Sequence, residues 1–194
     1  MEKDLFGNKV KKKRKTRLEN SLKKYDSSSF EDRLQRLTFL NNIFPKGYGI
    51  IGDQETVYVF SEAKMAFING EFISSILLAQ AFIERKLQIH YKSFGLEKVA
   101  KRGLKSIIDY ARKNNLLDSY LIDKIDSLRK KRNPFLHIKP YDYEFNLSQR
   151  IFNDLKNSKT FRQPIEILEA DAKDAISLMY TIFITDLKKI NSAT

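Results

Sequence analysis

Apolar side chains recur every three or four positions along most of this chain, the spacing that places them on one face of an α-helix. The pattern predicts helices over residues 30–44, 54–69, 71–94, 96–114, 117–132 and 165–190. The segment 71–94 has the widest apolar face, so we expect it to be the central helix. No sustained alternation of apolar and polar residues predicts a β-strand. The expected fold is therefore all-α, an antiparallel helical bundle.

Polar and turn-forming residues mark where these helices begin and end. The serines at 27–29 are expected to cap the first helix, and residues 45–49 (Pro-Lys-Gly-Tyr-Gly) to form the turn after it. Asp53 or Gln54 begins the second helix, and Asn69-Gly70 interrupts the pattern before the third. The stretch 140–164, rich in Tyr, Asn and Ser, is expected to be irregular.

Much of the positive charge lies at the N-terminal end. The formal net charge is +12, and residues 1–24 hold ten Lys/Arg against three Asp/Glu. We expect a flexible basic arm over 1–27 and a single helical domain over 28–194. Such an arm attracts nucleic acid by displacing counterions, and residues 11–15 also resemble a nuclear import signal. A solvated tail that aids solubility is the alternative interpretation, and a DNA-binding regulator is a further one.

The composition excludes several classes of protein. Apolar residues make up 42% of the chain, with fourteen Phe and nine Tyr, which favours a folded core over disorder. The chain has no cysteine and only two histidines, so we expect no disulfide, no thiolate chemistry and no histidine-rich metal cluster. The longest apolar run, Phe72 to Ile83, is about half the ~20 residues that a membrane span requires. We expect a cytoplasmic protein that binds no membrane and uses no metal or cofactor.

One short stretch combines residues that suit phosphate chemistry. Arg132-Asn133-Pro134-Phe135-Leu136-His137 follows the basic run Arg129-Lys130-Lys131. An arginine holds a phosphate with two parallel hydrogen bonds, and an imidazole exchanges a proton near neutral pH. Cleavage of an RNA phosphodiester without a metal needs both abilities. The alternatives are structural: Arg132 complements the negative end of its helix, and His137 is an ordinary surface or core histidine.

The geometry of this stretch favours a site shared by two chains. Pro134 disfavours helical geometry at Asn133, so we expect the preceding helix to end near Arg132. Even on one continuous helix, residues five apart point about 140° away from each other. A two-fold axis would bring both copies of Arg132 and His137 into one cleft. We therefore expect a homodimer.

The stretch resembles the motif of the HEPN-domain family, a family of helical bundles. Its ribonuclease members carry Arg, a polar residue, and then His after four to six intervening positions, as Arg132, Asn133 and His137 do here. The segments 61–70 and 73–84 are similar to the two leading helices of the family, including the glutamate, Glu84, that ends the apolar run. The resemblance covers roughly residues 55–190.

The resemblance implies a metal-independent endoribonuclease that leaves a 2′,3′-cyclic phosphate and a 5′-hydroxyl. His137 would take the proton of the ribose 2′-hydroxyl or protonate the leaving 5′-oxygen, and Arg132 would neutralise the transition state. Asn133 would orient the phosphate or the imidazole. RNA-binding residues would be the following: Arg129, Lys130, Lys131, Lys139 and Tyr141. Glu84 would support the site, although a salt bridge in helix packing is its alternative role.

The resemblance also suggests a biological setting. A toxin or an antiviral effector is expected, with an antitoxin or another defence-system protein as a partner. Members paired with nucleotidyltransferase antitoxins usually carry Tyr two positions after the His, and that position is Lys139 here. A non-catalytic HEPN module that binds RNA or nucleotide, or that serves as a dimerising scaffold, is the alternative function.

Overall fold

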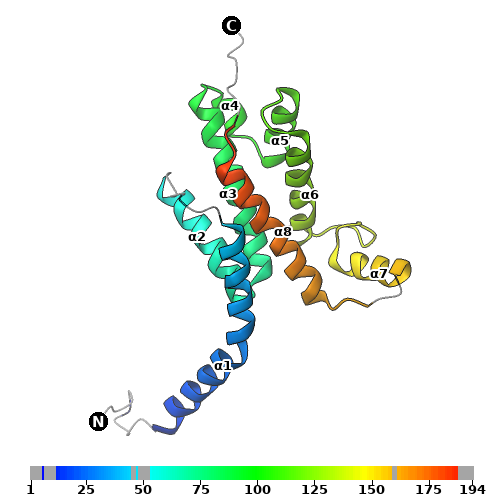
Figure 1. Cartoon of the computed structure of the whole chain (residues 1–194). Helices are drawn as coiled ribbons and strands as arrows, with labels where there is room; N and C mark the ends of the chain where they lie inside the picture. The colour runs from blue at the N-terminus through cyan, green and yellow to red at the C-terminus, as the bar shows by residue number, and fades with distance from the viewer. Residues whose placement is uncertain (1–5, 7–11, 45–46, 48–52, 159–160, 188–194) are drawn as a thin grey trace.

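The described residues of the computed structural model, 6, 12–44, 47, 53–158 and 161–187, form eight helices and no strand (Figure 1). The all-α prediction is therefore confirmed. The helices are α1 (Lys12–Ile43), α2 (Gln54–Asn69), α3 (Phe72–Ser93), α4 (Glu97–Ala100), α5 (Leu104–Lys113), α6 (Ser119–Leu136), α7 (Leu147–Ser158) and α8 (Pro164–Ile184). Among these residues, no helix combines the length and the apolar character that crossing a membrane requires.

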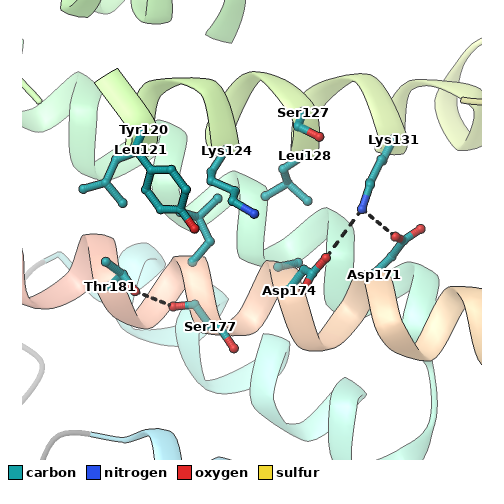
Figure 2. A pocket seen from close by; sticks show the side chains of 12 residues that line it. Tyr120, Leu121, Lys124, Ser127, Leu128, Lys131, Asp171, Asp174, Ser177 and Thr181 are labelled. Carbon is teal, nitrogen blue, oxygen red and sulfur yellow. Dashed lines mark hydrogen bonds and ion pairs between the residues drawn. The ribbon is translucent and has the colours of Figure 1, made fainter. Parts of the chain in front are cut away.

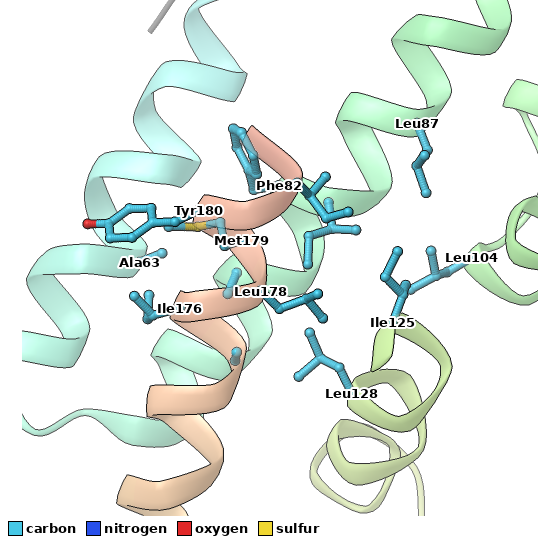
Figure 3. Close-up of a cluster of buried hydrophobic side chains, with 14 of the residues drawn as sticks. Ala63, Phe82, Leu87, Leu104, Ile125, Leu128, Ile176, Leu178, Met179 and Tyr180 are labelled. Atoms are coloured by element: carbon cyan, nitrogen blue, oxygen red, sulfur yellow. The ribbon is translucent and has the colours of Figure 1, made fainter. Parts of the chain in front are cut away.

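Helix α3 is central, as its wide apolar face predicts. It contacts α2, α4, α5, α6 and α8. Ile76 and Ile83 are fully buried on it, and Figure 3 shows Phe82 and Leu87 facing side chains of α5, α6 and α8. Burial of each such side chain contributes about 1.5–3 kcal/mol, so this shared core fixes where α6 and α8 lie relative to α3.

Both ends of α2 follow the sequence prediction. The Asp53 carboxylate accepts a hydrogen bond from the backbone N–H of Thr56 at 2.9 Å and so caps α2. Gly70 ends the helix in the left-handed region with φ of 80°, and its N–H donates to the carbonyl of Phe67 at 3.1 Å. The chain turns back after Gly70, so α2 and α3 form a helical hairpin and lie side by side (Figure 1).

Two other boundaries differ from the prediction. The segment 96–114 forms two helices, α4 and α5, because the chain extends at Gly103 (φ −67°, ψ 160°) before α5 begins. The stretch 140–164 is not irregular throughout, since it contains α7. Leu147 and Ile151 are half-buried on α7, and Arg150 binds Asp171 of α8. The helix is therefore stabilised by tertiary contacts that its polar sequence does not reveal.

Helix α1 begins at Lys12, well before the predicted start at Phe30. The hydroxyls of Ser28 and Ser29 do not cap a helix; they donate to the Tyr25 carbonyl at 3.0 and 2.9 Å within α1. Such bonds often bend a helix, and α1 changes direction along its length (Figure 1). The division of the chain at residue 27 stays a prediction. The predicted turn at 45–49 lies outside the described residues except for Gly47.

Candidate functional site

The Arg–His stretch, residues 132–137, lies at the C-terminal end of α6. The prediction that this helix ends near Arg132 is wrong. The helix continues through Pro134 to Leu136, and His137 follows as the C-cap residue. Proline at this position removes one N–H donor but does not force the preceding residue out of the helix. The last turn is closed by the N–H of His137, which donates to the Asn133 carbonyl at 2.9 Å. Arg132 and Asn133 are therefore helical residues.

Arg132 is half-buried and is held between two of the predicted site residues. Its Nη1 donates to Oδ1 of Asn133 at 3.2 Å, and Glu84 of α3 interacts with it electrostatically. Burial lowers the pKa of Arg132, while the Glu84 carboxylate raises it. Burial raises the pKa of Glu84, and Arg132 acts against that rise. The guanidinium is still a cation at neutral pH, so the site holds a fixed positive charge of defined orientation.

His137 is exposed at the end of the same helix, in extended backbone conformation (φ −138°, ψ 132°). The side chains around it in the sequence are apolar and unusually exposed: Leu136 at 49%, Ile138 at 103% and Tyr141 at 86%. Arg132 faces α3 whereas His137 faces solvent. One chain therefore presents the two groups of the stretch separately, consistent with the divergence expected for residues five apart.

The three cations before Arg132 are paired with carboxylates. Arg129 and Lys130 both bind Asp126 on their own helix, at 2.7 and 3.2 Å. Lys131 binds Asp171 of α8 at 2.8 Å and also contacts Asp174 at 3.5 Å. Their RNA-binding role stays a prediction, but much of their charge is neutralised within the fold.

Figure 2 shows Lys131 at one end of a groove of about 250 Å³ between α6 and α8, with its ammonium group directed at the two aspartates. Asp171 is 2% exposed and also accepts hydrogen bonds from both terminal nitrogens of Arg150, one of them at 2.9 Å. This one carboxylate therefore ties α6, α7 and α8 together beside the Arg–His stretch.

The partners of these cations differ in how far the sequence indicates them. The spacing of Asp126 and Lys130 is i,i+4, a helical pair that is visible in the sequence. Asp171 lies on the apolar face of α8 between Ile167 and Ala175, which signals a buried carboxylate but not its partners. Nothing in the sequence points to Arg150, because its pairing depends on where α7 docks.

Lys139 and Tyr141 lie in the loop between α6 and α7. The ammonium group of Lys139 is 5.8 Å from the centre of the Tyr143 ring, a cation–π contact. The Asn146 side chain donates to the carbonyls of Pro140 and Tyr141 at 2.7 and 3.3 Å, which holds the loop. Tyr141 projects from this anchored backbone into solvent. The structure thus places both predicted RNA-binding residues just beyond His137.

The fold and the site define an all-helical protein with a half-buried Arg-Asn pair at one helix end and an exposed histidine after it. Comparison of the chain with protein-family models, curated proteins and solved structures found no match. In the part of the chain that the structure describes, no three His, Asp or Glu side chains gather as a metal site.

Proposed function

We propose that this protein is a HEPN-type endoribonuclease that cleaves RNA without a metal ion and acts as a homodimer, in the role of a toxin or an antiviral effector. In the reaction the ribose 2′-oxygen attacks phosphorus and the 5′-oxygen leaves, which yields a 2′,3′-cyclic phosphate and a 5′-hydroxyl. His137 of one copy accepts the 2′-hydroxyl proton, and the imidazole of the second copy donates a proton to the 5′-oxygen. Arg132 stabilises the charge that develops on the phosphate.

The observation that carries this proposal is the preorganisation of Arg132. Its guanidinium is half-buried and bonded to Asn133 beside Glu84, so little rotamer freedom remains to be lost when a phosphate binds. An arginine that served only to complement the end of its helix would not need a half-buried carboxylate from α3. The arrangement suits electrostatic stabilisation, in which charged groups are fixed before the reaction begins.

The exposed surface around His137 supports the dimer. Leu136 and Ile138 flank the histidine with apolar side chains that are 49% and 103% exposed. Burial of such side chains drives association of two identical surfaces. In a two-fold assembly this surface would cover the end of α6 and bring the two copies of the Arg–His stretch together.

The test is digestion of end-labelled RNA in buffer with EDTA, with analysis of the product ends. We expect products with cyclic phosphate and 5′-hydroxyl ends, and we expect His137→Ala and Arg132→Ala each to reduce the rate by about 10²–10⁴. His90→Ala and Arg102→Ala are the matched controls and should cleave like the wild type. RNA with 2′-O-methyl riboses should resist all of them.

Two results would contradict the catalytic proposal. Cleavage that persists in the doubly substituted Arg132→Ala/His137→Ala dimer would place the active site elsewhere or reveal a contaminant. A wild-type protein that binds RNA but never cleaves it would favour the non-catalytic HEPN module. The separation of Arg132 from His137 within one chain is the observation that favours that second function.

A further inference from the structure

The N-terminal half of α1 projects from the rest of the molecule. Figure 1 shows this part of the helix extending away from the other helices, whereas its C-terminal half lies against them. Leu40 is buried there, and the Phe39 ring is 5.6 Å from the Phe67 ring of α2. In contrast, the described side chains of residues 16–28 are all exposed. The projecting half therefore contributes little to the core.

This projecting half is strongly basic. Between residues 12 and 25 the sequence has seven Lys/Arg, one Glu and three large apolar residues, Leu18, Leu22 and Tyr25. Arg17 and Lys24 are seven positions apart and share one face of the helix, and the three apolar residues occupy another. Charge rather than apolar area dominates this surface.

The cations of the projecting half differ from those near the Arg–His stretch. Arg129, Lys130 and Lys131 are paired with aspartates. Arg17, Lys23 and Lys24 have no ion pair with any carboxylate among the residues that the structure describes, and their side chains are exposed. No described carboxylate therefore neutralises these three cations.

We propose that the N-terminal half of α1 binds the phosphate backbone of single-stranded RNA through Arg17, Lys23 and Lys24. The N-terminal half of α1, residues 12–28, has seventeen helical residues and is about 25 Å long, enough to contact several phosphates along the RNA. Binding releases counterions from the RNA and carries no sequence preference of its own. The proposal rests on the proposed function in one respect, that RNA is the ligand; α1 then supplies affinity while the end of α6 supplies the chemistry.

The experiment measures binding of the full chain to a fluorescent 20-nucleotide RNA in which every ribose carries a 2′-O-methyl group. This RNA lacks the attacking hydroxyl, so binding is measured without cleavage. The test variant is Arg17→Gln/Lys23→Gln/Lys24→Gln. We expect its affinity at 0.15 M salt to fall at least about tenfold, and the slope of log K against log salt to shrink by about two for three lost phosphate contacts.

Two controls separate this contact from general effects of charge and folding. Lys98→Gln/Arg102→Gln/Lys113→Gln removes the same charge from exposed positions around α4 and α5, and its affinity should change by less than a factor of two or three. Leu18→Gln/Leu22→Gln alters the apolar face of the same helical half and keeps its charge, so its RNA binding should match the wild type. Circular dichroism of each variant checks that the helix content is retained.

The outcomes distinguish this proposal from the nuclease proposal. Equal loss of affinity in the two charge variants would overturn the α1 contact, as would equal loss in the leucine variant. A wild type that binds anionic phospholipid vesicles but not the RNA would also overturn it. If the methylated RNA binds through α1 while unmodified RNA is never cleaved, only the catalytic proposal fails.

Discussion

Asp171 is the single residue whose loss should most disturb the end of α6. It is buried, and its carboxylate binds both Lys131 of α6 and Arg150 of α7. Removal of one partner from a buried ion pair leaves the other charges uncompensated. We expect Asp171→Asn to lower the free energy of unfolding by about 3 kcal/mol, since Lys131 and Arg150 keep partial contact with water. Urea denaturation followed by circular dichroism measures this change.

Asp174→Asn is the matched control for that substitution. Asp174 lies on the same helix and contacts the same lysine at 3.5 Å, but its side chain is 74% exposed. An exposed ion pair contributes at most about 1 kcal/mol, so the control should be nearly as stable as the wild type. Equal effects of the two substitutions would show that Asp171 is not a buried link between the three helices.

The free energy of unfolding should depend on pH through the titration of Glu84. Burial holds its pKa above the ordinary value of 4.5 in spite of Arg132. Between the unfolded pKa and the raised folded pKa, the folded chain binds more protons than the unfolded chain, so the free energy of unfolding falls as pH rises. Glu84→Gln cannot titrate at this position and should lack that part of the fall.

The measurement is urea denaturation of the wild type and Glu84→Gln at several pH values from 4 to 8. The difference in unfolding free energy, wild type minus variant, should decrease with rising pH and then level off. A difference that increases with pH would mean that attraction to Arg132 outweighs burial and that the carboxylate is stabilised in the folded chain.

At the scale of helices, boundaries set by local residues were predictable and those set by distant contacts were not. Asp53 and Gly70 act within one turn of their own helix, so their patterns predicted both ends of α2. Helix α7 depends on a contact between Arg150 and Asp171, twenty-one positions apart, and no local pattern indicates such a contact. The predicted end of α6 near Arg132 was wrong for a related reason. A proline disrupts a helix less when it lies in the last turn, and the position of that turn depends on distant contacts.

The site shows the same division between local and distant information. Arg132, Asn133 and His137 are close in sequence, so the sequence alone placed them together at one end of a helix. The carboxylate partners of Arg132 and of the neighbouring Lys131 come from α3 and α8. Only the packing of those helices around the core brings Glu84 to Arg132 and Asp171 to Lys131.

Glycine substitutions test whether the turn after α2 depends on backbone conformation. At Gly70 φ is +80°, and an added Cβ would lie 3.2 Å from the Arg36 guanidinium. That guanidinium donates to the Ile68 carbonyl at 2.9 Å. A left-handed conformation costs an L-residue about 1–2 kcal/mol, so Gly70→Ala should lower the free energy of unfolding by at least about 1 kcal/mol.

Two other glycines separate the causes of that loss. Gly95 also has positive φ, at +73°, but an added Cβ meets nothing within 4 Å, so Gly95→Ala should show the backbone cost alone. Gly103 has negative φ and open space, and Gly103→Ala should change the stability by less than about 0.5 kcal/mol. Equal effects at all three positions in thermal or urea denaturation would contradict the conformational explanation.

At the scale of the whole molecule, the proposed activity depends on assembly, because one chain directs Arg132 toward α3 and His137 toward solvent. A dimer with one shared cleft predicts complementation between inactive variants. Homodimers of Arg132→Ala lack both guanidiniums, and homodimers of His137→Ala lack both imidazoles. A mixed dimer has one guanidinium and one imidazole in the cleft, so it keeps the charge stabilisation and one of the two proton transfers. Unfolding and refolding the two variants together should therefore raise the ribonuclease activity above that of either parent and leave it well below that of the wild type.

The control mixes Arg132→Ala with the doubly substituted Arg132→Ala/His137→Ala chain, which exchanges subunits in the same way but provides no guanidinium. Sedimentation velocity confirms that all samples are dimers, and tags of different mass on the two chains report how much mixed dimer forms. Activity should follow the amount of mixed dimer in the first mixture and stay at background in the control. A sample rich in mixed dimer yet as inactive as its parents would contradict the expectation that one guanidinium and one imidazole from different chains support partial activity.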